Sequence, residues 1–550
     1  MNSPPEEIVT TPVTLFVGPN NSGKSKVLAE INQYCSRGKQ NVTDVIIESI
    51  EFNAFDKVAI KLAEEKIKKI HTYTYSNDEP LADNLIFEIP VGIKNLCNSI
   101  PRKSVLDVLQ NPNSQPENFC KWYLAYQTLM LGGDSRINLI KEQSAGDLQS
   151  PKTSFQVLFC DDNKRKEVRR IIHEAFGSYL VIDPTSLGTL RLRLSSRPPK
   201  TDIEERGLHD EAIKFHKQAS PIEQFSDGVK AFTGIITEIF AGEPEIILID
   251  EPEAFLHPPL SFKLGKEIAS STIGLEKRLF VSTHSSKFVM GCIQSGATIN
   301  IVRLTYRNEV ATARILPNKE ILHLMRNPLL RSTGVLEGLF YEFVIVTESD
   351  ADRAFYEEIN ERLLLYKPEL GIPDCLFLNA QNKQTVHIIM KPLRELGIPT
   401  VAIVDVDILK DGGQTWTNFL KGGFIPKLEH QPLSGLRTDI KQKINDTRKN
   451  IKRDGGVDIL SGSDKEAANN LFDKLSEYGL FVVRKGELES WLSHLNVSGH
   501  GPNWLIEIFE KMGENPESQD YLKPADDDVW SFLGEIKKWF TNPKRKGIPL

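Results

Sequence analysis

The sequence predicts an α/β protein with more than one domain, and three observations carry this prediction. An apolar strand at residues 13–17 runs into the glycine-bearing segment 18–25 and then into a helix. A second apolar strand, at residues 246–249, ends in two acids. From residue 343 onward, β-branched strands alternate with helical segments, which is typical of a small parallel sheet. Because 550 residues exceed what one hydrophobic core supports, we expect roughly two to four domains.

Residues 18–25 read Gly-Pro-Asn-Asn-Ser-Gly-Lys-Ser, which is a complete phosphate-binding loop between a strand and a helix. Gly18 and Gly23 let backbone N–H groups turn toward the phosphates. Lys24 supplies charge for the β and γ phosphates, and Ser25 offers a hydroxyl to the Mg²⁺ that accompanies ATP. The residues expected to contact the nucleotide here are Gly18, Asn20, Asn21, Gly23, Lys24 and Ser25.

The second strand delivers Asp250 and Glu251 at its carboxyl end. We expect Asp250 to hold the Mg²⁺ of the nucleotide, and Glu251 to orient or deprotonate the attacking water. The cofactor predicted for this half of the chain is therefore ATP with Mg²⁺.

Two further segments lie in a characteristic order. Residues 223–228, Glu-Gln-Phe-Ser-Asp-Gly, precede the Asp-Glu strand, and a strand after it reaches His284. This order resembles the ABC ATPase superfamily, and the Ser-Asp-Gly form looks like its non-transporter members that work on DNA. The resemblance implies that Ser226 and Gly228 complete the ATP site of a second protomer, that His284 senses the γ-phosphate, and that the protein is a homodimer or larger. As isolated residues, Ser226 would be a helix N-cap and His284 a structural histidine.

The stretch between the phosphate loop and Ser226 is longer than a compact ATPase core needs. Residues 46–52 and 57–62 are expected as further core strands, and residues 63–180 as an inserted helical arm and candidate dimerisation element. A loop within this arm carries Arg136, for which a phosphate contact, an interprotomer contact and a surface salt bridge are the alternatives.

Four acids follow strands in the second half of the chain. Glu348 and Asp352 follow one apolar strand, and Asp405 and Asp407 follow another. The carboxyl ends of parallel strands meet where ligands bind in such sheets. Two hard cations, Mg²⁺ or Mn²⁺, need about this many carboxylate oxygens.

This pattern resembles the Toprim domain of topoisomerases, primases and a set of nucleases. Glu348 matches its first glutamate, Asp405 and Asp407 match its later Asp-x-Asp, and Asp352 matches the extra acid of the nuclease-type members. Ser349 stands where a glycine is usual.

A late patch at residues 481–489 joins a strand to basic and acidic residues. The Toprim resemblance implies a catalytic lysine and a late metal-binding acid, which we place at Lys485 and Glu487. An exposed mixed-charge turn is the alternative.

An ABC-type ATPase followed by a Toprim domain resembles the OLD (overcoming lysogenization defect) family of bacterial and phage ATP-linked endonucleases, several of which serve antiphage defence. The resemblance covers residues 10–60 and 180–500. It implies an ATP-regulated, metal-dependent DNA endonuclease that works alone, with a helicase-like partner, or within a retron reverse-transcriptase assembly. The alternative is an ATP-gated DNA clamp or repair scaffold whose Toprim domain is regulatory or needs a partner. A topoisomerase or primase is disfavoured, because no tyrosine nucleophile or cysteine pair is evident.

The expected domains follow from these motifs. They are an ATPase domain at residues 1–62 and 181–330, the arm at 63–180, a Toprim domain at 335–500 and a C-terminal helical tail at 501–550.

The composition of the chain bears on its expected cellular location and on its expected binding partners. The six cysteines are scattered, which fits a reducing cytoplasm, and neither a signal segment nor a run of about 18 apolar residues is evident, so no membrane association is expected. The net charge of −7 is only a weak argument against nucleic-acid binding, because affinity for phosphates depends on local basic clusters. Candidate clusters, which are otherwise solvated faces, lie at residues 164–170, 191–197, 448–453 and 544–546.

Overall fold

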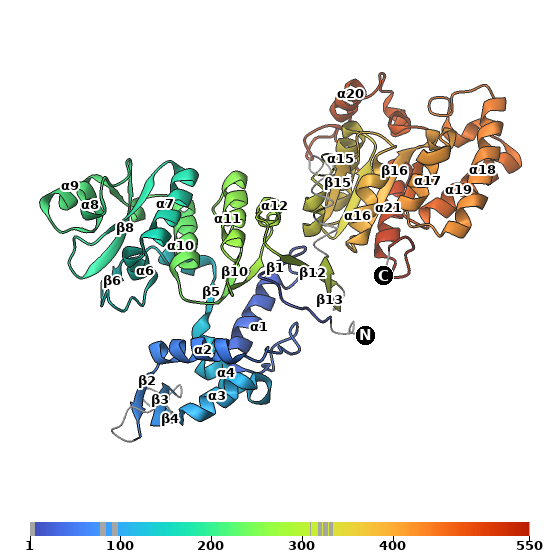
Figure 1. Ribbon diagram of the computed structural model, residues 1–550. Coiled ribbons are helices and arrows are strands. Elements are labelled where there is room, and N and C mark those ends of the chain that lie inside the picture. Colours follow the sequence, from blue (N-terminus) through green and yellow to red (C-terminus); the bar gives the residue numbers. More distant parts are fainter. Residues whose placement is uncertain are drawn as a thin grey trace. The chain divides into compact units, whose positions relative to one another are not determined.

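The structure is a computed structural model, and it describes residues 6–76, 84–90, 97–307, 310–316, 322, 328, 330 and 334–548. The chain divides into two compact units (Figure 1). The first contains residues 1–17 and 21–318, and the second contains residues 319–550 together with the three loop residues 18–20. No helix in the described part of the chain combines the length and the apolar character needed to cross a membrane.

A six-stranded sheet lies at the centre of the first unit, in the order β13-β12-β1-β11-β10-β5. All neighbours pair in parallel except β12 and β13, which are antiparallel. Phe16, Leu248 and Val302 from three of these strands share one core with Val27 of the helix that follows β1. The strands are β1 (Val13–Val17), β5 (Thr128–Leu131), β10 (Ile246–Asp250), β11 (Arg278–Ser282), β12 (Ile299–Arg307) and β13 (Val310–Leu316).

Helices and two smaller antiparallel sheets complete the first unit. The smaller sheets have the orders β2-β3-β4 and β6-β8-β7, and β9 pairs with β8. Their strands are β2 (Thr72–Tyr75), β3 (Leu85–Pro90), β4 (Cys97–Pro101), β6 (Gln143–Ser144), β7 (Tyr179–Asp183), β8 (Thr189–Ser195) and β9 (Ser220–Pro221). The helices are α1 (Lys24–Arg37), α2 (Lys57–Ile70), α3 (Arg102–Gln110), α4 (Pro116–Trp122), α5 (Gly133–Asn138), α6 (Ser154–Cys160), α7 (Asp162–Phe176), α8 (Asp202–Arg206), α9 (Asp210–Gln218), α10 (Asp227–Ala241), α11 (Pro258–Ser270) and α12 (Ser286–Gln294).

The two segments expected as extra core strands are not strands. The carboxylate of Glu30 accepts hydrogen bonds from the backbone N–H groups of residues 45–47, at 2.8 to 3.0 Å, so these groups are not available to a neighbouring strand. Residues 57–62 begin helix α2, because the Asp56 side chain caps it by accepting from Val58 and Ala59 N–H groups.

Residues 63–180, expected as a helical arm, contain strands as well as helices. The four residues of β5 join the central sheet, with Leu131 opposite Ile249 of β10. This segment therefore supplies an edge strand of the sheet that carries Asp250, and the helical expectation is wrong at these positions.

The second unit is built on a four-stranded parallel sheet in the order β15-β14-β16-β17. The strands are β14 (Phe343–Thr347), β15 (Cys375–Asn379), β16 (Thr400–Asp405) and β17 (Leu480–Val483). The helices are α15 (Asp350–Tyr366), α16 (Val386–Glu395), α17 (Gly413–Gly422), α18 (Lys427–Asp446), α19 (Gly462–Ser476), α20 (Pro502–Met512) and α21 (Asp528–Thr541).

The C-terminal helices belong to the core of this second unit. Trp504 of α20 and Trp530 and Leu533 of α21 are buried in one cluster with Phe343 and Phe355 from the β14–α15 segment. Residues 501–548 are thus part of the folded unit and not a separate tail.

Candidate ATP site and candidate metal centre

The phosphate loop has the backbone that its sequence predicts. Gly18 and Gly23 have φ angles of 148° and 94°, which favour glycine, and Asn21 has φ 60°. Helix α1 starts without a side-chain cap, so the N–H groups of its first turn are not taken by one. Lys24 is buried, with its ammonium 3.4 Å from the Ser22 hydroxyl. A loop and helix start of this kind suit an anionic phosphate.

Ser25 and Asp250 meet although 225 residues separate them in sequence. The Ser25 hydroxyl donates to a carboxylate oxygen of Asp250 at 2.9 Å, and the Ser282 hydroxyl donates to the same oxygen. Ser25 and Asp250 are the two side chains expected to hold the Mg²⁺ of ATP through their oxygen atoms.

Glu251 and His284 also lie together. The Glu251 carboxylate is 3.3 Å from the imidazole of His284, and the Glu251 backbone adopts φ 50°. Burial lowers the pKa of His284, and the neighbouring Lys24 lowers it further. A neutral imidazole is thereby favoured beside Lys24.

Ser226 and Gly228 lie at the start of α10. Ser226 occupies the N-cap position, but its side chain makes no capping hydrogen bond, and it is exposed. A Cβ at Gly228 would lie 2.6 Å from the carbonyl oxygen of Phe255, so the close approach of that loop requires glycine. The capping role considered for Ser226 is therefore not the one it has here.

Three of the predicted metal ligands converge in the second unit. Glu348, Asp405 and Asp407 each offer a carboxylate oxygen within 4.8 Å of the others. Glu348 also accepts a hydrogen bond from the Asp405 backbone N–H at 2.9 Å. The carboxyl ends of β14 and β16 position all three, as parallel neighbouring strands do.

Burial and mutual repulsion shape this cluster. Desolvation, followed by the charge of Asp405, raises the pKa of Glu348 well above the usual range of a carboxyl group. Desolvation likewise raises the pKa of Asp405, against the opposing effect of Lys452. Buried carboxylates that resist ionisation together fit a divalent cation, which would neutralise them.

Asp352, the fourth predicted ligand, is not one of the three converging carboxylates, and its contacts are structural. Its carboxylate accepts from the Ser349 N–H at 2.9 Å and the Ser349 hydroxyl at 2.7 Å, while Ser349 caps the N3 N–H of α15 in return. Ser349 has φ −138°, an extended backbone that needs no glycine. The serine therefore fits this turn well.

The lysines at the carboxylates are not the one that the sequence indicated. The ammonium of Lys452 lies 2.8 Å from Asp405 and 3.8 Å from Asp407, and that of Lys383 lies 3.0 Å from Asp407. Lys485 instead pairs with Asp528 at 2.6 Å and is 52% exposed. Lys452 lies in the basic run 448–453, for which the sequence left phosphate binding and a solvated face as alternatives.

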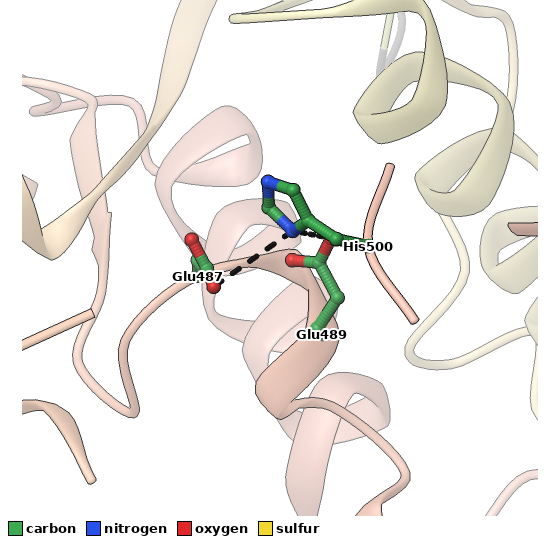
Figure 2. Close-up of side chains that lie close together, drawn as sticks. All are labelled: Glu487, Glu489 and His500. Atoms are coloured by element: carbon green, nitrogen blue, oxygen red, sulfur yellow. Dashed lines mark ion pairs between the residues drawn. The ribbon is translucent and has the colours of Figure 1, made fainter. Parts of the chain in front are cut away.

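A second group of possible ligands lies beside the first. Figure 2 shows the imidazole of His500 directed at the carboxylates of Glu487 and Glu489. Its Nδ1 atom lies 2.5 Å from Glu489 and 4.0 Å from Glu487. Lys452, 3.2 Å from Glu487, connects this group to Asp405. Of the three, only Glu487 was predicted, because nothing near His500 in sequence marks it as a ligand.

Most of the basic clusters are neutralised within the fold. Arg191 and Arg193 pair with buried Asp183, and Arg165 and Arg169 pair with buried Glu205. In the C-terminal cluster, Lys546 pairs with Glu477 at 2.6 Å. The run at 448–453 differs, since its Lys452 reaches the carboxylate cluster.

Comparisons with known proteins identify the domains that carry these residues. A family model described as "AAA domain, putative AbiEii toxin, Type IV TA system" matches residues 164–290, and one described as "Overcoming lysogenization defect protein-like, TOPRIM domain" matches residues 339–407. The chain is thus an ATPase domain joined to a Toprim domain. That order is the one of an OLD-family ATPase–Toprim fusion, so the resemblance drawn from the motifs and the predicted α/β class are confirmed. None of the curated proteins matches the chain.

Solved structures similar to the chain include heads of SMC proteins. The SMC head bound to the C-winged helix domain of ScpA is 14% identical, with 57% of this chain and 92% of that chain covered and a TM-score of 0.31. The SMC head domain from Thermotoga maritima is 13% identical, with 56% and 92% covered and a TM-score of 0.27. At these TM-scores the likeness carries no argument about function.

Proposed function

We propose that this protein is an ATP-regulated, metal-dependent DNA endonuclease that hydrolyses phosphodiester bonds at Glu348, Asp405 and Asp407. The observation that carries the proposal is the meeting of these half-buried carboxylates at the carboxyl edge of the Toprim sheet. The Toprim match identifies the domain, and the carboxylate cluster supports the proposed chemistry.

The carboxylates would hold Mg²⁺ or Mn²⁺ through oxygen ligands. When bound, such a cation activates water and stabilises the leaving oxygen. Hydrolysis joins the water oxygen to phosphorus and breaks one bridging P–O bond, which leaves a phosphate end and a hydroxyl end. Glu348 and Asp405 suit this chemistry, because desolvation raises their pKa values and a bound cation would favour their charged forms.

Lys452 is proposed to carry the role that the motif had placed at Lys485. Its ammonium already lies among Asp405, Asp407 and Glu487, where it offsets their charge. Once a cation binds the carboxylates, this ammonium can turn to a phosphate oxygen and stabilise negative charge there. The exposed Arg453 beside it adds a second positive charge for the DNA backbone.

A second cation would be held on the side of Glu487, with Glu489 and His500 as neighbours. The carboxylate oxygens suit Mg²⁺ or Mn²⁺, whereas the imidazole nitrogen is a donor typical of transition-metal sites and not of Mg²⁺ sites. Asp352 is a further candidate ligand, and it would have to give up part of its contact with Ser349 to bind the ion.

The first unit is proposed to bind and hydrolyse ATP. Gly18, Asn20, Asn21 and Gly23 place the loop, and Lys24, Ser25 and Asp250 hold the phosphates and Mg²⁺. Glu251 orients the attacking water, with His284 next to it. Ser226 and Gly228 of a second copy would close the site, so ATP binding is proposed to join two heads and to control access to the nuclease site.

Antiphage defence, a helicase-like or retron partner, and action in the cytoplasm are proposed only through the OLD resemblance. An ATP-gated DNA clamp is the second candidate. It is favoured by the ammonium groups of Lys383 and Lys452, which offset part of the carboxylate charge by pairing with Asp407 and Asp405.

A cleavage assay tests the proposal. Supercoiled plasmid is incubated with the protein and Mg²⁺ or Mn²⁺, beside an Asp405→Asn/Asp407→Asn variant. Metal-dependent nicking or linearisation that the variant lacks supports the nuclease. The clamp would be favoured if the protein does not cleave DNA and if its Mn²⁺ binding is the same with and without the Asp405 and Asp407 carboxylates.

A further inference from the structure

Arg136 is a buried charge in the first unit. It lies in α5, which directly follows β5, and only 2% of its surface is exposed. Because β5 runs beside β10, α5 starts at the same edge of the sheet as Asp250 and Glu251. A guanidinium is always charged and carries five N–H donors, so burying it is costly unless it is tightly bound.

The guanidinium of Arg136 donates a hydrogen bond to the backbone carbonyl of Glu251. The backbone N–H of Glu251 donates to the backbone carbonyl of Ser282, in the neighbouring strand β11, at 2.9 Å. Both sides of Glu251 are therefore fixed. Its φ of 50° is a left-handed conformation that costs a residue with a side chain, and this conformation needs such contacts to persist.

A second contact connects Arg136 to the helix that begins after Ser226. A Cβ on Gly234 of α10 would lie 2.8 Å from the backbone carbonyl of Arg136 and 2.9 Å from the Cβ of Leu139. Glycine therefore lets α10 and α5 approach backbone to backbone. Arg136 therefore contacts α10 through its backbone and Glu251 through its guanidinium.

We propose that Arg136 is a positioning residue for ATP hydrolysis, which holds Glu251 in its left-handed backbone and thereby aims its carboxylate. Through α5 it also connects α10, whose start is expected to meet a second copy, to Glu251. The inference rests on the proposed role of Glu251. It replaces the surface salt bridge and the phosphate contact that the sequence left as alternatives for Arg136.

The test separates binding from turnover. Arg136→Met and Arg136→Lys are compared with the wild type in ATP affinity, measured with a fluorescent nucleotide, and in kcat for hydrolysis. We expect kcat of Arg136→Met to fall on the order of 10–100-fold with affinity nearly unchanged, because a misplaced catalytic group costs rate and not binding. Arg136→Lys, which keeps the charge with fewer directed donors, should lie between.

Arg165→Met is the matched control. Arg165 is also buried, and its guanidinium also donates to backbone carbonyls, those of Leu158 and Phe159 at 2.9 Å. The positioning role is overturned if Arg136→Met lowers kcat no more than Arg165→Met does, or if affinity falls in step with kcat. If Arg136→Met does not fold, the kcat of Arg136→Lys decides. A wild type that hydrolyses no ATP overturns both proposals, and a Glu251→Gln variant as active as the wild type overturns the role of Glu251 itself.

Discussion

At the scale of single residues, buried charge decides what each site can do. Glu348 and Asp405 lie next to each other with raised pKa values, and Lys452 supplies a compensating positive charge beside Asp405. Such carboxylates bind a proton or a cation more readily than a free carboxyl group does.

A dependence of stability on pH follows from Glu348 and Asp405. Because their pKa values are raised in the folded protein, the folded state binds more protons than the unfolded state above about pH 4, where free carboxyl groups titrate. The melting temperature of metal-free protein should therefore fall as pH rises from about 5 to about 8, and Mn²⁺ should restore it most at the higher pH. Asp405→Asn should flatten the fall. A melting temperature in EDTA that rises over this range, in wild type relative to Asp405→Asn, would contradict the account.

Lys452 and Lys485 give a second prediction, which concerns the rate of DNA cleavage. Lys452→Gln should lower the cleavage rate on the order of 10²–10³-fold, because it removes the positive charge nearest the carboxylates. Lys485→Gln should cleave nearly as the wild type does, since its ammonium pairs with Asp528. Initial rates of plasmid nicking measure both. The opposite order of effects would return the catalytic role to Lys485.

The sequence could predict the acids better than their partners. Glu348, Asp405 and Asp407 follow strands directly, so the strand pattern places them together. Lys452 comes from an irregular segment after α18, and His500 lies in a loop before α20, so no periodicity brings either to the carboxylates.

At the scale of elements, short and irregular segments differ most from expectation. β5 has four residues and follows a 3₁₀ turn, so no alternation marks it as part of the sheet. The strongly apolar strands β1, β10, β14 and β16 are found where the sequence predicts them, because parallel strands buried on both faces are nearly continuous runs of apolar residues.

The C-terminal helices give a prediction at this scale. Leu533 of α21 is 0% exposed and Ile506 of α20 is 61% exposed. Leu533→Ala should lower the free energy of unfolding of the second unit by about 2–5 kcal/mol, whereas Ile506→Ala should change it by less than about 0.5 kcal/mol. Urea unfolding followed by tryptophan fluorescence measures both. Equal small effects would be expected of a detached tail and not of this core.

At the scale of the whole molecule, an ATPase domain and a Toprim domain are joined in one chain, and their order could be predicted because each motif set lies in its proper strand context. The smaller sheets of the first unit are harder to predict, because β2, β4 and β6 are short and lack a regular pattern. Leu alternates with polar residues along β8, which is a strand signal in the sequence.

Association of two copies is the prediction that belongs here. ATP should raise the molar mass of a Glu251→Gln variant, which is expected to bind ATP without hydrolysing it, to that of a dimer or larger assembly. Ser226→Arg in that background should prevent the increase, because a bulky side chain at the exposed start of α10 would block the second copy. Ser196→Arg, at another exposed serine of the first unit, is the control. Light scattering measures the molar mass. If the mass of the Glu251→Gln variant does not change when ATP is added, closure of the site by a second copy is contradicted.

The central claim is that one site binds ATP, a separate site cuts DNA, and the first controls the second. The most direct measurement is the rate of metal-dependent plasmid cleavage with and without ATP, for the wild type and for Lys24→Ala and Asp407→Ala. We predict that ATP changes the rate of the wild type, that Lys24→Ala still cuts at a rate ATP no longer alters, and that Asp407→Ala does not cut. Loss of all cutting in a folded, normally assembled Lys24→Ala protein, or cutting by Asp407→Ala, would contradict this division of roles.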